Sequence, residues 1–326
     1  MMLEVKNLQV NFSTPRGILH AVKGVSFNLE KGEFLGIVGE SGSGKSVTAA
    51  SIMNLIPNNG LVSGEVIMNG KRPLTMSMKE LLSFRGPEIA MIFQEPGRSF
   101  DPIYNIKKTF FETFKAHEPT ISEADSEFRT IKLLKEVHLP QPEDRLNNFP
   151  HQFSGGQLQR IMIALALASE PNLLIADEPT TALDVTIQAE IVDLLLELKK
   201  NRKLAVIFIT HDIELVSRLV NNIIVMYSGL IMENNKSKKI ITDPHHPYTR
   251  GLLNSLPSFG SHYSTHTLNS IPGSVPDPLL TVQGCPFAPR CTLIKNKCLE
   301  KLPDLNREDG RYRCIIEGPK GDSIFG

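Results

Sequence analysis

Residues 39–46 carry the pattern G-x-x-x-x-G-K-S, which is suited to holding the phosphates of a nucleotide. The members of this phosphate loop are Gly39, Glu40, Ser41, Gly42, Ser43, Gly44, Lys45 and Ser46. Gly42 and Gly44 permit backbone angles that turn successive N–H groups toward one anion. We expect Lys45 to reach the β- and γ-phosphates and the Ser46 hydroxyl to hold Mg²⁺. The loop therefore predicts that the chain binds a nucleoside triphosphate.

Two carboxylates follow the apolar run 173–176, which is typical of a buried strand. Asp177 is placed to hold the metal, directly or through a water molecule. Glu178, one residue further on, is placed to take a proton from the attacking water. An acidic cap on a strand is the structural alternative. Beside Lys45, the pair indicates hydrolysis of the bound nucleotide.

Gln94 and His211 also stand at the ends of apolar runs, 89–93 and 204–210. Polar groups at the carboxyl ends of parallel strands are where ligand contacts gather in α/β sheets. We expect Gln94 to serve the metal and the catalytic water, and His211 to sense the γ-phosphate. A purely structural histidine is the alternative.

A second candidate anion site consists of residues 154–157, in front of an apolar helix that runs through Leu167. Its members are Ser154, Gly155, Gly156 and Gln157. Serine is a good N-cap, and the two glycines expose backbone N–H groups at the helix start. As a short string it could equally be a plain helix cap. Phe12, before the turn at 13–17, is a candidate for stacking on adenine, and a core aromatic is an equal alternative.

The elements expected around these residues alternate between strands and helices. The run 34–38 is predicted as a buried strand and 47–56 as the helix that points its N-terminus at the phosphates. The stretches 2–10 and 20–29 alternate apolar and polar residues, as antiparallel strands do. From 95 to about 165 the strand signals stop and amphipathic helical patterns begin. This stretch is predicted to be a helical insertion.

Composition is that of an ordinary globular protein. The 326 residues are 41% hydrophobic and 21% charged, and 35 Lys and Arg balance 35 Asp and Glu. A zero net charge argues against a nucleic-acid partner, which usually requires a basic excess. No apolar run reaches the 18 residues of a membrane span, and the first residues lack the anatomy of a signal peptide. We therefore expect a cytoplasmic protein that docks on a membrane partner.

Taken in order, these motifs resemble those of the ATP-binding subunit of ABC transporters, over residues 1 to about 235. Residues 39–46 match its Walker A loop, Gln94 the Q-loop, 154–157 the signature, 173–178 Walker B with the catalytic glutamate, 181–184 the D-loop and His211 the switch histidine. The resemblance implies an α/β P-loop NTPase with a RecA-like core, an N-terminal antiparallel β subdomain and the helical insertion. It also implies ATP as the nucleotide and adds Asp184 to the nucleotide contacts.

The same resemblance implies a head-to-tail pair of subunits, in which each ATP lies between one Walker A loop and the opposite signature. Closure on ATP and reopening after hydrolysis would then drive transport through membrane subunits. A DNA-handling ATPase with the same type of nucleotide-binding domain is a remote alternative. Such proteins insert coiled coils or zinc modules, and no sustained heptad run separates Gln94 from Ser154.

The C-terminal part resembles that of oligopeptide, dipeptide and nickel importer ATPases. The resemblance rests on the His-Pro-Tyr segment within 243–253, on 271–273 and on 284–291. It implies an ATP-binding domain at 1–240, with the helical subdomain at about 95–165, and an extension at 241–326. It also implies a second, similar ATPase subunit, two transmembrane permease subunits, an extracytoplasmic solute-binding protein and a peripheral place on the cytoplasmic face of the membrane. A nickel or metal-chelate cargo stays open beside peptides. The segment 94–102 departs from its relatives' usual sequence, which leaves the rules for pairing with the permease open.

All four cysteines lie in the C-terminal part, at Cys285, Cys291, Cys298 and Cys314. Their spacing lacks the close C-x2-4-C pair of most structural zinc sites, and disulfides are disfavoured in a reducing cytoplasm. Four thiolates without histidine suit a [4Fe–4S] cluster, and relatives with this Cys-rich tail carry one. Zn²⁺ is the alternative. We expect the bound cluster or metal to stabilise a Pro-rich tail. Its loss should leave ATP binding by residues 1–235 unaffected.

Overall fold

The structure is a computed structural model that describes all residues except 182, 256–269, 281, 308–309 and 317–326. The chain forms two compact units. The first consists of residues 1–29, 34–74 and 209–326, and the second of residues 30–33 and 75–208. In the part of the chain that is described, no helix has both the length and the apolar character needed to cross a membrane.

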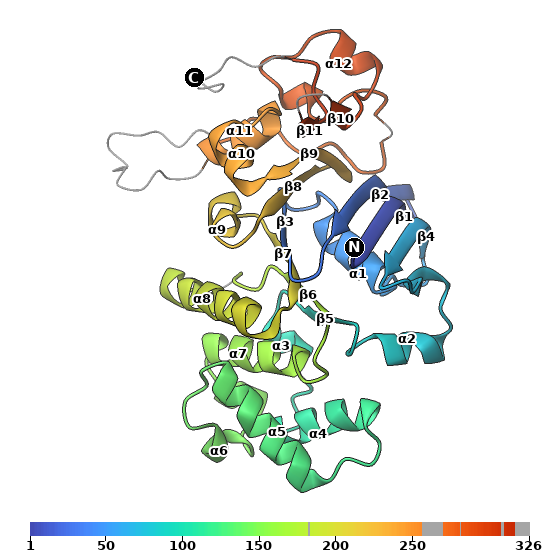
Figure 1. Ribbon diagram of the computed structural model, residues 1–326. Helices are drawn as coiled ribbons and strands as arrows, with labels where there is room; N and C mark the ends of the chain where they lie inside the picture. The colour runs from blue at the N-terminus through green and yellow to red at the C-terminus, as the bar shows by residue number, and fades with distance from the viewer. Residues whose placement is uncertain (182, 256–269, 281, 308–309, 317–326) are drawn as a thin grey trace. The chain divides into compact units, whose positions relative to one another are not determined.

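An antiparallel sheet of three strands opens the first unit (Figure 1, blue). Its strands are β1 (Leu3–Thr14), β2 (Gly17–Leu29) and β4 (Gly60–Met68), with β1 in the middle. Leu3 of β1 pairs with Leu29 of β2 and with Met68 of β4, and all three side chains are buried. They lie on one face of the sheet. The two N-terminal strands predicted from alternation are therefore confirmed, and each is longer than predicted.

A second group of strands in the first unit runs in the order β10-β11-β9-β8-β3. These strands are β3 (Phe34–Val38), β8 (Asn222–Tyr227), β9 (Leu230–Lys236), β10 (Asn306–Arg307) and β11 (Gly310–Tyr312). β3 pairs in parallel with β8, whereas β8 and β9 form a hairpin that β11 extends. Every residue of β3 is buried, as its unbroken apolar run predicts.

Helix α1 (Lys45–Ile52) begins directly after the phosphate loop. Our predicted range of 47–56 is wrong at both ends. The helix starts earlier because Gly44, at φ 96°, already turns the chain into it. It stops at Ile52 because Asn54 adopts a left-handed φ of 53°. The other helices of this unit are η1 (Pro73–Thr75), α9 (Ile213–Ser217), α10 (Ser237–Thr242), α11 (Pro247–Asn254), η3 (Ala288–Arg290) and α12 (Lys297–Glu300).

The second unit contains the strands β5 (Ile89–Ile92) and β6 (Leu173–Asp177) and most of β7 (Ala205–Thr210), whose last two residues belong to the first unit. They lie in the order β7-β6-β5, and β5 pairs in parallel with β6. All residues of β6 and β7 are buried, which agrees with the predicted core strands. Both strands end on a polar residue, Asp177 and Thr210, which brings polar groups to their carboxyl ends.

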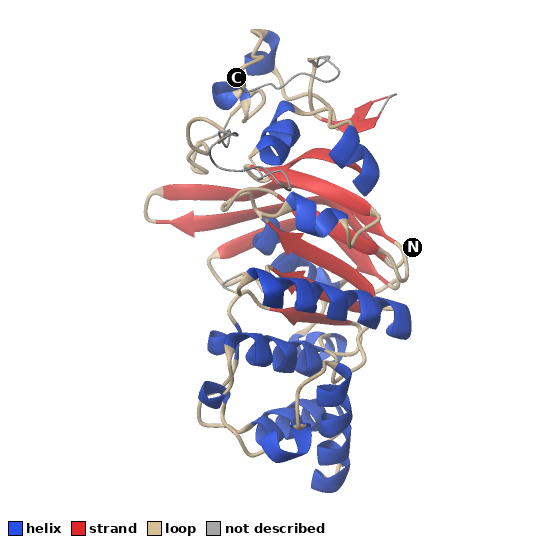
Figure 2. Ribbon diagram, turned by 90° about the vertical axis from the view of Figure 1, so that its left-hand side faces the viewer, coloured by secondary structure: helices blue, strands red, loops and turns tan. Residues whose placement is uncertain are grey.

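The change from strands to helices predicted after Gln94 is present (Figure 2). The helices of the unit are α2 (Met78–Phe84), α3 (Pro96–Ser99), α4 (Ile106–His117), α5 (Glu123–Glu136), α6 (Pro142–Arg145), η2 (Pro150–Gln152), α7 (Gly155–Ala166) and α8 (Val185–Arg202). Asn105 and Ser122 cap α4 and α5. Between these helices Phe114 is buried, and the Arg129 guanidinium lies 4.3 Å from its ring centroid.

Candidate nucleotide site

The phosphate loop connects β3 to α1, and close contacts or backbone angles require its glycines. A Cβ atom on Gly39 would lie 2.2 Å from the Met226 carbonyl oxygen, and one on Gly44 would lie 2.6 Å from the Ala21 carbonyl oxygen. Gly42 meets nothing within 4 Å, but its φ of 75° favours glycine. Ser41, Gly42 and Ser46 are exposed. The glycines therefore determine the conformation of the loop, and its exposed residues are accessible to a ligand.

Two polar groups inside the loop fit an anion. Lys45 is only 4% exposed, and its ammonium group donates hydrogen bonds to the carbonyls of Gly39 (2.7 Å) and Glu40 (3.0 Å). The Ser43 hydroxyl is buried and has no hydrogen-bond partner. Because buried polar atoms are rarely left unpaired, an unsatisfied hydroxyl in this loop fits a site that is completed by a phosphate.

The first unit also contains Phe12 and His211, the predicted contacts for adenine and the γ-phosphate. Phe12 lies on β1 opposite Leu19 and Gly60, is half-buried, and its ring covers the space where a Cβ on Gly60 would lie. Its role as an adenine platform stays a prediction. His211 is exposed directly after β7, where Asp212 caps α9 by accepting from the N–H groups of Glu214 and Leu215.

In the second unit, the structure brings Gln94 and Glu178 together. The Gln94 side-chain amide donates to a Glu178 carboxylate oxygen at 3.3 Å, and the Thr181 hydroxyl donates to the same oxygen at 2.8 Å. Glu178 has a φ of 48°, a left-handed conformation that is costly for a residue with a side chain. Asp177, the residue before it, is 6% exposed at the end of β6. The arrangement orients a single carboxylate at a strand end, as a general base requires.

Thr181 is a further functional candidate that its sequence motif does not single out. It lies in the predicted D-loop, 181–184, and the structure shows that its hydroxyl donates to Glu178. Asp184, the predicted nucleotide contact of this turn, instead caps α8 by accepting from the Ile187 N–H group at 3.0 Å. Its carboxylate is exposed and can accept further bonds.

The predicted second anion site begins α7 with a capping box. The Ser154 hydroxyl accepts from the Gln157 N–H group, and the Gln157 side-chain oxygen accepts from the Ser154 N–H group. A Cβ on Gly156 would lie 2.8 Å from the Ile187 side chain, so glycine is required there. Ser154 and Gly155 are exposed. The cap and the anion site are therefore compatible, because the exposed start of the helix can still face a ligand.

Comparisons with known families agree with this geometry. A model of the ABC transporter family matches residues 22–181. A model described as "Oligopeptide/dipeptide transporter, C-terminal region" matches residues 232–298. The oligopeptide transport ATP-binding protein OppD of Bacillus subtilis is 46% identical over 93% of this chain and 85% of its own length. The chain belongs to the ATP-binding subunits of peptide-type ABC transporters.

Other relatives place this ATPase in the same group. The dipeptide transport ATP-binding protein DppD of Haemophilus influenzae is 45% identical over 95% of this chain and 93% of its own length. Among solved structures, the ATP-binding cassette MJ0796, a dimer with ADP and Pi, superposes with a TM-score of 0.65 at 30% identity. The match covers 72% of this chain and 99% of MJ0796. The ATPase therefore has the α/β P-loop fold predicted from its motifs, and it hydrolyses ATP.

The four cysteines of the ATPase line one small, mainly apolar cavity of about 20 Å³ in the C-terminal region. All four are free thiols; Cys285, Cys298 and Cys314 are buried and Cys291 is partly buried. Among the described residues, however, no group of three or more His, Cys, Asp or Glu side chains is arranged to hold a metal ion. The predicted metal group therefore stays a prediction, because the described side chains show no preformed ligand geometry.

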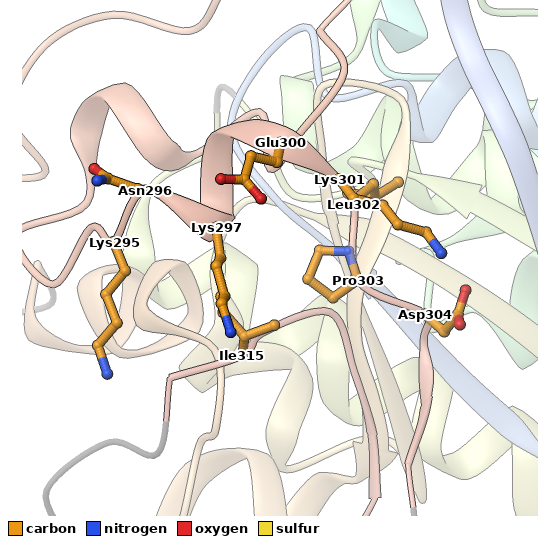
Figure 3. Close-up of a pocket in the computed structure, with 9 residues that line it drawn as sticks. All are labelled: Lys295, Asn296, Lys297, Glu300, Lys301, Leu302, Pro303, Asp304 and Ile315. Atoms are coloured by element: carbon orange, nitrogen blue, oxygen red, sulfur yellow. The ribbon is translucent and has the colours of Figure 1, made fainter.

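A wider hollow of about 820 Å³ lies in the same region of the ATPase (Figure 3). Lys295, Lys297 and Lys301 contribute to its wall, with Glu300 and Asp304 set among them. None of its lining residues belongs to the nucleotide motifs, and its charges are mixed. We assign no nucleotide role to it.

Proposed function

We propose that this ATPase couples the binding and hydrolysis of ATP to the uptake of di- and oligopeptides across the cell membrane. The match of residues 232–298 to the C-terminal region of oligopeptide and dipeptide transporters carries the proposal. The named peptide transport relatives, which cover nearly the whole chain, support it. We place residues 1–240 in the ATP-binding domain, with the helical subdomain at about 95–165, and residues 241–326 in the extension.

The proposed roles of the side chains follow from the family's motifs, and contacts within each unit support them. Lys45 and the N–H groups of the phosphate loop bind the phosphates, and Ser46, Asp177 and Gln94 serve Mg²⁺. The metal supplies charge neutralisation at the phosphates. Glu178 takes the proton of the attacking water, held by Gln94 and Thr181.

The partners of the complex are also proposed from the family. They are a second, similar ATPase subunit, two transmembrane permease subunits and an extracytoplasmic solute-binding protein, with no nucleic acid. The exposed Ser154 and Gly155, at the start of α7, then face the ATP of the second ATPase. The complex would hold this chain at the cytoplasmic face of the membrane.

The cargo is tested by measuring uptake in cells that lack this gene. Uptake of a radiolabelled dipeptide should fall to background and return with the wild-type gene, but not with a Glu178→Gln gene. Uptake of radiolabelled nickel should be the same in all strains. Loss of nickel uptake with unchanged peptide uptake would assign the ATPase to the metal importers instead.

We further propose that the cysteine cavity accepts a [4Fe–4S] cluster. A single tetrahedral zinc would draw the four sulfur atoms to about 3.8 Å from one another, because each Zn–S bond is about 2.3 Å. A cluster with one iron for each thiolate holds its cysteines further apart. Four cysteines and no carboxylate line the cavity, and His246 also lines it, with its Nε2 4.0 Å from the Cys285 sulfur.

Anaerobically purified protein should be brown and contain about four iron and four sulfide per chain. Cys291→Ser should remove the colour and increase proteolysis of the C-terminal region, because one ligand is lost. Ser255→Ala, a change of hydroxyl outside the cavity, serves as the control and should stay brown. A colourless preparation with one zinc per chain would contradict the cluster. The bound zinc would then stabilise the C-terminal region instead.

A further inference from the structure

Glu40 of the phosphate loop is held by two residues far along the chain, Tyr248 and Arg290. They lie 208 and 250 positions after it, within the same compact unit. Each belongs to a segment of the C-terminal part that the nucleotide chemistry does not use. Tyr248 ends the His-Pro-Tyr segment, and Arg290 precedes Cys291.

The Tyr248 hydroxyl accepts a hydrogen bond from the Glu40 backbone N–H group at 2.8 Å. The ring is fully buried between Tyr227 and Phe287, with centroids 4.7 and 5.3 Å away. Burial raises the pKa of this hydroxyl far above its ordinary value, so it stays protonated. His246 fixes the backbone there by accepting from the Tyr248 N–H group. The acceptor offered to Glu40 is therefore held in one place.

The Arg290 guanidinium binds the Glu40 carboxylate. Its two terminal nitrogens donate to the two Glu40 carboxylate oxygens at 2.7 and 3.0 Å, a bidentate pair. It also donates to the Tyr227 hydroxyl and to the Pro272 carbonyl oxygen. The Arg290 side chain is only 4% exposed, whereas that of Glu40 is 28% exposed. This pair is shielded better than an ordinary surface salt bridge.

The restraint on Glu40 reaches the group that contacts the nucleotide. The Glu40 carbonyl oxygen accepts from the Lys45 ammonium group at 3.0 Å, and the Gly39 carbonyl oxygen accepts from it at 2.7 Å. Glu40 thus has its N–H group and carboxylate bonded to the C-terminal part and its carbonyl bonded to the phosphate-binding lysine. A loop ordered before its ligand arrives loses less entropy on binding.

We propose that Tyr248 and Arg290 are positioning residues for ATP, which keep the phosphate loop in its binding conformation through Glu40. The proposal rests on ATP binding by the family and is independent of the cargo and of the cluster. It revises our expectation that changes in the C-terminal part spare ATP binding.

Equilibrium titration of the purified full-length chain with ATP tests the proposal. Tyr248→Phe keeps the ring packing and removes one acceptor, and Arg290→Gln removes the bidentate pair. Each should raise the Kd for ATP about threefold to tenfold, the range expected for one hydrogen bond or more. In the reconstituted transporter, KM for ATP should rise while kcat at saturating ATP changes little.

Two control variants separate positioning from general damage. Arg313→Gln removes a partly buried arginine of the same region whose bonds go to the Ile231 and Pro303 carbonyls, and Tyr104→Phe removes a hydroxyl from the second unit. Both should leave the Kd unchanged. In a Glu40→Gln background, Arg290→Gln should add little further loss, because the two side chains act through one contact.

The proposal fails if Tyr248→Phe and Arg290→Gln bind ATP as wild type does, or if Arg313→Gln weakens binding to the same degree. Full additivity of Glu40→Gln and Arg290→Gln would also overturn it. Thermal unfolding of each variant identifies a misfolded protein. Tyr248→Phe remains informative in that case because it changes no packing volume. Failure of ATP binding in the wild-type chain would instead refute the ATPase assignment.

Discussion

Glu178→Gln should lower ATP hydrolysis by about 10²–10⁴-fold, the usual size of a general-base contribution. The amide cannot take a proton from water, yet its oxygen can still accept from the Thr181 hydroxyl, so the local structure should persist. ATP binding should stay near the wild-type value. ATP-bound dimers with the partner ATPase should therefore accumulate. Turnover of the reconstituted transporter and a nucleotide titration measure the two effects.

A matched control for this variant is Glu190→Gln, which changes an exposed glutamate of α8 in the same unit. This control should retain wild-type turnover, because the exposed Glu190 side chain pairs with Arg160 and belongs to none of the nucleotide motifs. Near wild-type turnover of Glu178→Gln would show that another group takes the proton.

Ser154→Arg should abolish transport while the isolated chain still binds ATP. The residue caps α7 and is exposed, and in the proposed dimer it completes the ATP site of the partner subunit. A long side chain at this position would occupy the space of the phosphates. Loss of the cap itself costs only about 1 kcal/mol, which leaves the fold intact. ATP binding by the purified chain and uptake by the assembled transporter are the two measurements.

Ser122→Arg is the corresponding control, since Ser122 is an exposed serine that caps α5 through the same kind of bond, here to Asp125. Transport should survive this change, because no nucleotide is expected at α5. If Ser154→Arg lost ATP binding in the isolated chain, the signature would act within its own subunit or the fold would be damaged.

Short-range patterns predicted much of the fold and site. The strands β3, β6 and β7 follow from unbroken apolar runs, and the phosphate loop follows from its glycines and lysine. The end of α1 could not be predicted, because Asn54 in a left-handed conformation stops it without proline or glycine. The left-handed Glu178 was equally invisible, since only its tertiary surroundings impose that strain.

The contacts of Tyr248 and Arg290 with Glu40 could not be predicted from the sequence. Tyr248 and Arg290 each stand in a recognisable segment, but no local signal connects either to Glu40. Their bonds depend on how β8 and the C-terminal part pack in the first unit. The cysteine spacing indicated a shared site, and the structure adds that all four line one cavity. Spacing alone does not determine how far apart the sulfur atoms lie.

This chain uses ATP hydrolysis to import peptides. This activity is tested most directly in proteoliposomes that contain the chain, its partner ATPase and the permease subunits, with the solute-binding protein added. Accumulation of a radiolabelled dipeptide should require ATP and Mg²⁺ and should fall to background when Glu178→Gln replaces the wild-type chain. Peptide accumulation that is equal with both proteins, or nickel accumulation without peptide accumulation, would contradict the account.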